Sequence, residues 1–315
     1  MPTVTVLMSV YNGERHLADA VRSILAQTLE DFEFLIVDDG STDGSPEMLA
    51  AFESSDHRIR LLRNGRNIGL SESLNRGLRE ARSPLVARMD ADDWSHPTRL
   101  ERQVAFLWDR PEVDVVGSWI RLLGSRVVWR RPQRHDDIVA LLSFETCFWH
   151  PTVMFRYRRQ DRTGLGDAIV YDPLRKHAED YDLWVRLALD HGARFANIEE
   201  PLVDYRVHPA SITRAHSATQ VATARGIRCS QIERLGLPPS DAVLEIHDLL
   251  STYRLAPEPD LLARADEWLA RLRDANDRIG LYPREAFRRH IQSLVNLIHA
   301  KYAERSGEPS AEAAE

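Results

Sequence analysis

The chain has 315 residues, of which 43% are hydrophobic, and a formal net charge of -7, so it exceeds the usual length of one domain and can bury a sizeable core. A net negative chain has no overall attraction for nucleic acid, and no segment approaches the roughly 18 apolar residues of a membrane span. Because Met1 leads straight into a strand pattern, and Cys147 and Cys229 have no metal-ligand spacing, we expect no signal peptide, no disulfide and a cytoplasmic setting.

The first half of the chain alternates between strand and helix periods. Continuous apolar runs predict buried strands at residues 4–10, 32–37, 59–62 and 85–89, and helices with apolar stripes lie between them. Such strands joined by helices form sheets that are covered on both faces, so the fold class is α/β, with a mostly parallel central sheet flanked by helices. Ligands of these sheets bind beyond the carboxyl ends of the strands, where this chain carries its acidic residues.

From about Gly117 the pattern changes. Short strands are predicted at residues 113–116, 126–129, 152–155, 195–198 and 202–205, with helices near 138–142 and after Asp180. Beyond about Ser217 the pattern is helical, with breaks at the proline pairs 238–239 and 257–259. We predict a domain over residues 1–216 with halves 1–117 and 118–216, a helical C-terminal extension over 217–304, and a disordered tail at 305–315.

The first acidic cluster, residues 38–43, follows the second strand. Its carboxylates could accept hydrogen bonds from a base N–H or a ribose hydroxyl. The alternative is an ordinary turn in which Ser45, ahead of Pro46, caps the next helix.

The second cluster, Asp90-Ala91-Asp92-Asp93, follows the fourth strand. Magnesium and manganese prefer oxygen ligands, and in nucleotide sites carboxylates hold them together with the substrate's phosphates. Three acids on one tight loop repel one another unless they share a cation, which favours a metal–diphosphate site. A solvated acidic turn is the alternative.

Two further segments carry candidate groups. Glu179-Asp180 opens an amphipathic helix, where a carboxylate could act as a general base or could simply oppose the helix dipole. Tyr205-Arg206-Val207-His208 follows a strand, and His208 could complete a metal shell or could be an exposed loop residue.

The order and spacing of these segments resemble the inverting family-two glycosyltransferases of the A-type, nucleotide-diphospho-sugar transferase fold. The resemblance rests on residues 6–12, 38–43 and 90–93, on Asn67-Ile68-Gly69-Leu70 with Asn75, and on Glu179-Asp180 ahead of Trp184. It covers roughly the first two-thirds of the chain. The halves 1–117 and 118–216 would then be the nucleotide-binding half and the acceptor half.

The resemblance implies a role for each candidate residue. The base of a nucleotide would contact Asp39, and the nucleotide sugar as a whole would contact Val10, Tyr11, Asn12, Glu14, Asp39, Asn67, Asp90, Ala91 and Asp92. Asp93, Asp92 and His208 would hold a divalent metal ion, manganese or magnesium. Asp180, with Glu179 beside it, would be the catalytic base.

The implied reaction is a single displacement with inversion at the anomeric carbon, in which Asp180 takes the acceptor proton and the metal neutralises the leaving nucleoside diphosphate. A UDP-sugar is the first expectation for the donor, with dTDP- and GDP-sugars as alternatives. The acceptor would be a hydroxyl of a glycan or lipid-linked molecule in cell-surface polysaccharide synthesis. Since the Gln-x-x-Arg-Trp element of processive synthases is missing, addition of a single sugar is favoured.

Three other functions would require different features of the sequence. A nucleotidyltransferase would carry a glycine-rich basic loop after the first strand, and a nicotinamide enzyme would carry Gly-x-Gly-x-x-Gly there, whereas this chain has Tyr11-Asn12-Gly13-Glu14. A non-catalytic nucleotide-sugar-binding or scaffolding protein would not need every acid required for turnover.

The last helix raises the question of membrane contact. An apolar stripe at Phe287, Ile291, Leu294, Val295 and Ile298 is accompanied by Arg284, Arg288, Arg289 and Lys301. This face would either lie against anionic lipid, at the inner face of the cell membrane, or pack on its own domain. The sequence also leaves a homodimer open.

Overall fold

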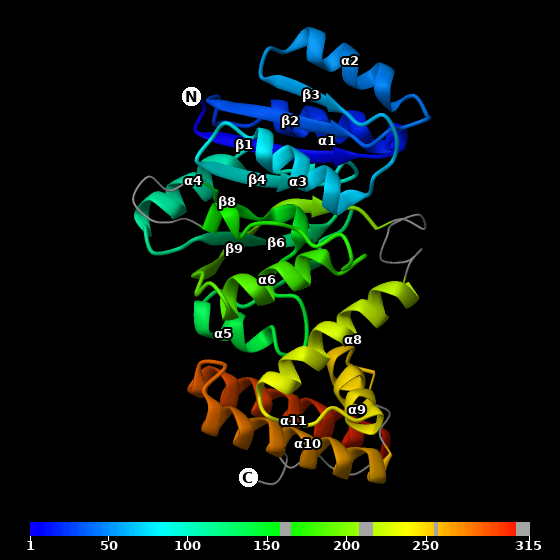
Figure 1. Ribbon diagram of the computed structural model, residues 1–315, viewed down its shortest axis with the longest axis vertical. Helices are drawn as coiled ribbons and strands as arrows, with labels where there is room; N and C mark the ends of the chain where they lie inside the picture. The colour runs from blue at the N-terminus through cyan, green and yellow to red at the C-terminus, as the bar shows by residue number, and fades with distance from the viewer. Residues whose placement is uncertain (158–164, 208–216, 255–257, 307–315) are drawn as a thin grey trace. The chain divides into compact units, whose positions relative to one another are not determined.

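The computed structural model describes residues 1–157, 165–207, 217–254 and 258–306, which form two compact units (Figure 1). The first unit consists of Met1–Arg134 and Phe148–Gln220, and the second of His135–Cys147 and the chain from Val221 onward. The second unit therefore includes a segment that the sequence placed in the acceptor half.

A mixed, mostly parallel sheet runs through the first unit (Figure 1). Its strands are β1 Val4–Val10, β2 Phe32–Asp38, β3 Ile59–Arg63, β4 Leu85–Met89, β5 Trp94–Ser95, β6 Val115–Leu122, β7 Val128–Trp129, β8 Met154–Arg156 and β9 Phe195–Tyr205. Within the described residues the order is β3-β2-β1-β4-β8-β6-β9-β5, with β7 paired to β6. The pairs β3·β2, β2·β1, β1·β4 and β6·β9 are parallel, which confirms the predicted fold class.

Helices cover both faces of this sheet. They are α1 Glu14–Leu25, α2 Ser45–Ser55, α3 Leu70–Glu80, α4 Arg99–Asp109 and α6 Glu179–Leu189, with short 3-10 turns at His150–Thr152 and Leu165–Asp167. α1 and α4 share one apolar core with alternate residues of β1, such as Val6 and Met8. α3 packs on β1 so closely that a Cβ on Gly77 would lie 2.2 Å from Leu7 Cδ1. Helices on both faces explain why β1 and β2 are continuous apolar runs.

The second half of the sheet differs from the prediction in detail. The two strands expected at 195–198 and 202–205 form the single strand β9, whose pairing with β6 shifts register beside Trp119. Pro201 lies opposite Trp119, and because proline has no N–H to donate, the ladder is interrupted by a bulge rather than ended. Thr152, expected in a strand, belongs to a 3-10 turn ahead of β8.

The second unit is helical. Its helices are α5 His135–Leu141, α8 Ser217–Arg234 (from Val221 on), α9 Asp241–Ser251, α10 Pro259–Ile279 and α11 Arg284–Ser306. α5 packs on α11 because its apolar side chains need cover, which is why this segment joins the second unit. α11 runs two residues into the predicted disordered tail, whose remainder lies outside the described residues. Cys147 and Cys229 are free thiols, the first buried and the second half-buried.

The apolar stripe of α11 packs inside its own unit. Phe287, Ile291, Leu294 and Ile298 are buried, so of the two alternatives left open by the sequence, packing within the domain is the one observed for these side chains.

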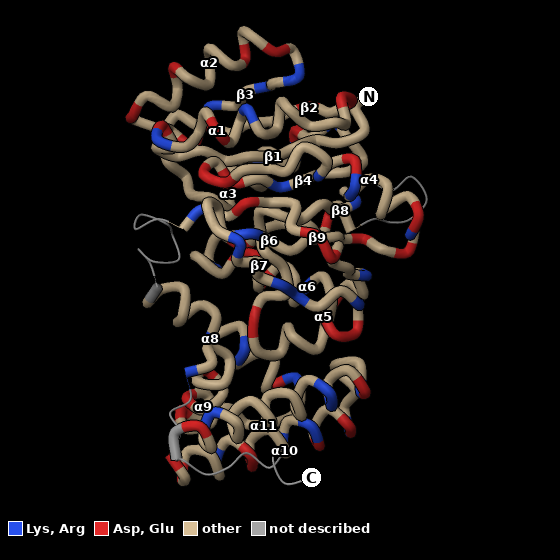
Figure 2. Tube along the Cα trace, turned by 180° about the vertical axis from the view of Figure 1, so that it is seen from behind, with Lys and Arg blue, Asp and Glu red and all other residues tan. Residues whose placement is uncertain are grey.

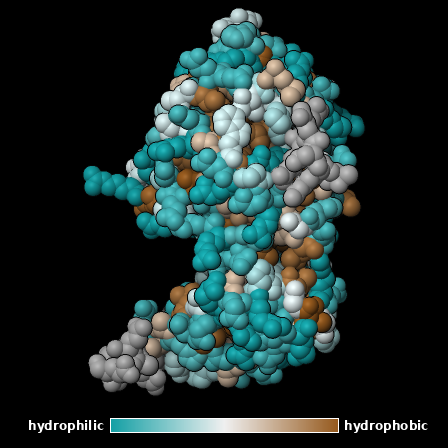
Figure 3. Space-filling model, turned by 90° about the vertical axis from the view of Figure 1, so that its left-hand side faces the viewer, coloured by the Kyte–Doolittle hydropathy of each residue, from teal (hydrophilic) through white to brown (hydrophobic). Residues whose placement is uncertain are grey.

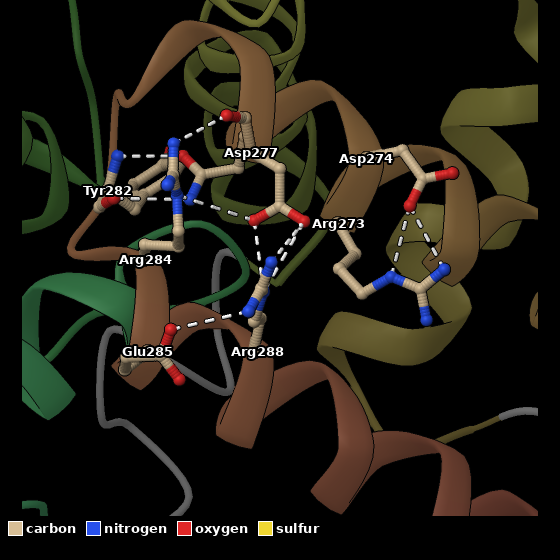
Figure 4. Close-up of polar contacts among 8 residues, drawn as sticks. Arg273, Asp274, Asp277, Tyr282, Arg284, Glu285 and Arg288 are labelled. Atoms are coloured by element: carbon tan, nitrogen blue, oxygen red, sulfur yellow. Dashed lines mark hydrogen bonds and ion pairs between the residues drawn. The ribbon is translucent and has the colours of Figure 1, made fainter.

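Basic residues of α11 also have partners in this unit. Figure 4 shows Arg288 bound to Asp277 and Glu285, with N–O distances of 3.0 and 3.3 Å, and Arg284 donating to the Asp277 carbonyl at 2.7 Å. Acidic and basic residues are interspersed along α10 and α11 (Figure 2). Arg284 and Arg288 therefore contact acidic residues of their own unit.

Hydrophilic side chains cover most of the face drawn in Figure 3, with hydrophobic side chains in smaller groups between them. Within the described part of the chain, the structure contains no helix that combines the length and the apolar character needed to cross a membrane.

Candidate functional site

The sequence-predicted acidic residues gather at one edge of the sheet. Val10 at the end of β1 pairs with Asp38 at the end of β2, and Met8 pairs with Met89 at the end of β4. Because these three strands are parallel neighbours, the segments that follow them emerge at the same carboxyl edge. The predicted site residues 10–12, 14, 39 and 90–93 therefore lie together.

Asp39 organises a loop. Its side chain is 2% exposed, and its Oδ1 accepts hydrogen bonds from Asn64 Nδ2 at 2.7 Å and from the Ile68 N–H at 2.9 Å. Its Oδ2 accepts from the Gly69 N–H at 2.9 Å. The carboxylate thus fixes residues 64–69, and its Oδ2 retains a lone pair for a ligand N–H.

A glycine allows this loop to close over the end of β2. Gly40 has a φ of 72°, and a Cβ there would lie 2.4 Å from the Arg66 carbonyl carbon and 2.7 Å from the Asn67 nitrogen. Only glycine fits such a backbone approach at positive φ without strain. Asn67, a predicted donor contact, is exposed on this loop.

Asn12 and Glu14 join the β1–α1 turn to the loop that follows β2. Asn12 Oδ1 accepts from the Thr42 N–H at 2.8 Å, and Glu14 Oε2 accepts from the Gly44 N–H at 3.0 Å. Ser45 Oγ accepts from the Gly13 N–H at 2.9 Å, so it does not cap α2, which starts at Ser45 itself. The sequence did not foresee these supporting contacts.

The other predicted donor contacts at this edge differ in exposure. Val10 is fully buried and accepts the Asp39 N–H at 2.7 Å through its carbonyl, whereas Tyr11 is 52% exposed and Ala91 is half-buried. Tyr11 therefore presents a ring at the rim of the site.

The acidic triplet forms a compact cluster. Asp90, Asp92 and Asp93 each offer a carboxylate oxygen within 4.8 Å of the others. Asp93 is 1% exposed, and its Oδ1 accepts the Arg206 N–H at 2.8 Å. Among the described residues, its buried Oδ2 has no hydrogen-bond partner.

This cluster fits a divalent cation. Burial raises the pKa of Asp93 well above its usual value, and the nearby Asp90 and Asp92 raise it further. A buried carboxylate oxygen without a donor, flanked by two other carboxylates, is the oxygen-only ligand set that magnesium and manganese prefer. His208, the other predicted ligand, lies outside the described residues.

The sequence did not predict the role of two buried arginines next to the cluster. Arg88 in β4 forms an ion pair with Asp90, and Arg99 in α4 donates to the Arg88 carbonyl at 2.7 Å. Burial lowers the pKa of Arg99 to about 9, and the positive charge of Arg88 adds to this effect. A charged residue inside a continuous apolar strand was the available signal for Arg88.

Glu179 and Asp180 lie in the first turn of α6. Glu179 is 7% exposed, and burial, followed by the charge of Asp180, raises its pKa to about 7. Asp180 is half-buried, and its Oδ1 accepts the N–H of Tyr181 at 2.8 Å. The two neighbouring acids therefore differ, the first being a buried acid and the second a more accessible carboxylate.

Arg88 links the two acidic groups electrostatically. Its charge acts on Asp90 and Asp93 and also on Glu179, so one guanidinium lies within electrostatic reach of both clusters.

His150, Tyr171 and Asn75 form a polar network near Arg88. His150 Nε2 and the Tyr171 hydroxyl are 2.9 Å apart, and the Asn75 amide bonds both the N–H and the carbonyl of Tyr171 at 2.8 Å. Burial, followed by the charge of Arg88, lowers the pKa of His150 well below its usual value. α3 is thereby joined to the segment ahead of α6. Asn75 belongs to the motif noted in the sequence, but His150 and Tyr171 do not.

Comparisons with known proteins show the family of the chain. Residues 5–177 match the model of "Glycosyl transferase family 2". The chain is 30% identical over 234 residues to the "O-antigen biosynthesis glycosyltransferase WbnJ" of Escherichia coli, covering 71% of this chain and 87% of WbnJ.

Two solved structures share the fold. S. aureus TarS 1-349 in complex with UDP-GlcNAc matches with a TM-score of 0.59 and 17% identity, over 98% of this chain and 93% of that one. The mannosyltransferase PcManGT from Pyrobaculum calidifontis, in complex with GDP-Man and Mn2+, matches with a TM-score of 0.58 and 20% identity, over 96% and 87%. The family match spans more than half of the chain, and the chain belongs to the family 2 glycosyltransferases.

Proposed function

We propose that this glycosyltransferase moves one sugar from a nucleoside-diphosphate donor to a hydroxyl of a glycan or lipid-linked acceptor in polysaccharide synthesis, with inversion at the anomeric carbon. The observation that carries the proposal is the buried Oδ2 of Asp93 inside the carboxylate cluster, which has no hydrogen-bond partner in the part of the chain that the structure describes. The first half of the fold would bind the nucleotide, and the segments after Gly117 in the same unit would face the acceptor.

Asp93 and Asp92 are the proposed ligands of a divalent ion. When bound, such an ion neutralises negative charge on the diphosphate. The protein's own contribution is to hold these carboxylates in place. The Arg206 N–H fixes Asp93 Oδ1, and Arg206 Nε donates to the Asp92 carbonyl at 2.8 Å. The structure of PcManGT is a complex with GDP-Man and Mn2+, which supports testing manganese first.

Asp180 is the proposed general base. It is half-buried at the start of α6, and a general base must reach the proton that it removes from the acceptor hydroxyl. Glu179, which is more deeply buried and whose pKa burial raises to about 7, is the alternative base.

The donor is proposed from both the site and the comparisons. The solved structures of TarS and PcManGT are complexes with UDP-GlcNAc and with GDP-Man, and WbnJ takes its name from O-antigen biosynthesis. A UDP-sugar stays the first proposal, with GDP- and dTDP-sugars next.

The test is a thermal-shift and calorimetric screen of UDP, GDP and dTDP with and without manganese, followed by a donor-hydrolysis assay. We expect one nucleoside diphosphate to raise the melting temperature only when manganese is present, and its sugar to be hydrolysed slowly. A ligand at 100 times its dissociation constant should add about 2.7 kcal/mol to stability. Binding without any turnover would identify a nucleotide-sugar-binding protein instead, and no metal-dependent binding would refute the proposed site.

A further inference from the structure

A group of aromatic side chains lies on the first unit near the acidic cluster. The ring centroids of Trp129 and Trp149 are 5.3 Å apart, and those of Trp129 and Tyr205 are 6.4 Å apart. The Arg131 guanidinium lies 4.5 Å from the Trp149 ring centroid. We call Trp129, Trp149 and Tyr205 the aromatic platform. Trp129 is 37% exposed, so it presents ring surface to solvent.

The platform is held rigidly. β7 pairs with β6, which places Trp129 opposite Ile120. Arg121 forms a bidentate ion pair with Asp204 at 2.8 and 2.7 Å, which locks β6 to the strand that carries Tyr205. These contacts fix the aromatic rings before any ligand arrives, which reduces the entropy lost on binding.

The backbone places the platform beside the proposed catalytic groups. Tyr205 directly precedes Arg206, whose N–H binds Asp93. Trp149 directly precedes His150, whose ring binds Tyr171. Two of the three rings are therefore one residue away from side chains of the site. The ring of the third, Trp129, lies 5.3 Å from that of Trp149 and 6.4 Å from that of Tyr205.

We propose that the aromatic platform is an acceptor subsite in which Trp129 stacks on a pyranose ring of the acceptor glycan. This inference rests on the proposed function. A pyranose has an apolar face of C–H groups and a rim of hydroxyls, and the negative face of an indole ring attracts such C–H groups. Ligand sites are typically lined by aromatic side chains with a few polar groups around them, and here Arg131 flanks the Trp149 ring.

A membrane surface is the competing occupant, because tryptophan and tyrosine also gather at membrane interfaces. Position favours the sugar, because Tyr205 directly precedes Arg206, whose N–H binds Asp93 of the acidic cluster.

The test compares Trp129→Ala and Trp129→Phe with Trp108→Ala. Trp108 is a matched control because it is 65% exposed at the end of α4 and takes no part in the platform. The probes are methyl β-D-glucopyranoside, methyl β-D-galactopyranoside and the corresponding β-1,4-linked disaccharides. Their binding is followed by saturation-transfer NMR with UDP and manganese present, and UDP affinity is measured separately by calorimetry.

We expect at least one probe to bind the wild-type protein and to bind Trp129→Ala about tenfold more weakly, which corresponds to about 1.4 kcal/mol. Trp129→Phe should recover part of the affinity, and Trp108→Ala should match wild type. UDP affinity should be the same in all four proteins, which separates failure of the subsite from failure of the proposed donor site.

Three results would overturn the subsite. In the first, none of the probes binds the wild-type protein. In the second, wild type and Trp129→Ala bind the probes equally well. In the third, Trp129→Ala loses affinity for UDP in parallel with its affinity for the probe. Flotation with phosphatidylglycerol vesicles that requires Trp129, without any effect on the probes, would assign the platform to a membrane instead.

Discussion

Asp39 and Asp93 are both buried carboxylates at the carboxyl edge of the sheet, but their surroundings differ. Asp39 accepts hydrogen bonds from Asn64, Ile68 and Gly69. Asp93 accepts one backbone bond, and its other oxygen has no partner among the described residues. Asp39 is therefore satisfied by the protein alone, whereas Asp93 gains from a cation.

The first prediction concerns Asp93→Asn. Without metal, the variant should be more stable than wild type, because burial and the charges of Asp90 and Asp92 disfavour the Asp93 carboxylate. Nucleoside-diphosphate affinity in manganese should fall about tenfold or more, and the manganese dependence should disappear. Thermal unfolding and titration calorimetry measure both effects, with the exposed Asp109→Ala as control. Unchanged metal dependence would show that Asp93 is not a ligand.

The second prediction concerns the base. Asp180→Asn keeps the size of the side chain but removes its basicity, so transfer should fall about 10²–10⁴-fold, or roughly 3–5 kcal/mol of barrier, while donor and metal still bind. If Asp180 only favours the helix start, the change should cost about 1 kcal/mol of stability or less. Single-turnover transfer and nucleotide titration separate these cases.

Glu179→Gln is the matched control for that experiment. An inactive Glu179→Gln beside a nearly normal Asp180→Asn would move the base to Glu179. Activity in both variants would remove the base from the proposed mechanism.

The third prediction concerns pH. The folded-state pKa of Glu179 is raised to about 7 from 4.5, chiefly by burial. Its contribution to stability is therefore complete below the unfolded-state pKa and is lost as the pH rises through about 7. Glu179→Gln should gain on the order of 1–3 kcal/mol relative to wild type between pH 5 and pH 8. Denaturant titrations of both proteins at the two pH values test this, and parallel profiles would contradict it.

At the residue scale, the sequence predicted groups that follow strand ends and missed groups supplied by distant contacts. Residues 90–93 could be located because they directly follow an apolar run. Asn64, His150 and Tyr171 could not, because their roles depend on partners in other elements. Periodicity does not encode such pairings.

At the element scale, the buried parallel strands were the most predictable parts. β1 and β4 have the bounds expected from their apolar runs, because a strand covered on both faces needs apolar residues at every position. The mixed half was less predictable. Its strands are shorter or bulged, and the placement of α5 depends on contacts with α11.

The fourth prediction tests the link between α3 and the segment ahead of α6. Asn75→Ala leaves the Tyr171 N–H and carbonyl without their side-chain partner in a buried position. The expected loss of stability is about 2–4 kcal/mol. Chemical denaturation measures it, and Arg79→Ala, an exposed change on the same helix, should be nearly neutral. Equal stabilities of the two variants would mean that the backbone groups find other partners.

At the scale of the whole molecule, the second unit is assembled from two separate parts of the chain. Phe144 stacks on His247 with a centroid distance of 4.4 Å. The ring nitrogens of His247 bond the Ser143 carbonyl at 2.9 Å and Trp268 Nε1 at 3.2 Å. The segment His135–Cys147 is therefore bound to helices about a hundred residues later.

The fifth prediction follows from this arrangement. Deleting residues 221–315 removes α8 from Val221 onward together with α9 to α11, and uncovers Ile138, Leu142 and Phe144, which are 1% exposed or less. We expect the truncated protein to bind a hydrophobic dye and to elute as an aggregate in size-exclusion chromatography. Serine at these three positions in the same truncation should restore a monomer. A monodisperse, dye-free truncation without these substitutions would contradict the interpretation.

The divided second unit also bears on how the chain folds during its synthesis. His135–Cys147 leaves the ribosome well before α9, α10 and α11. At translation rates of roughly 5–20 residues per second, the helices that cover this apolar segment are synthesised about 10–30 s after it. During that interval it is a candidate for chaperone capture, so ribosome-associated chaperones should influence the yield of this protein more than that of a family member whose helical unit is contiguous.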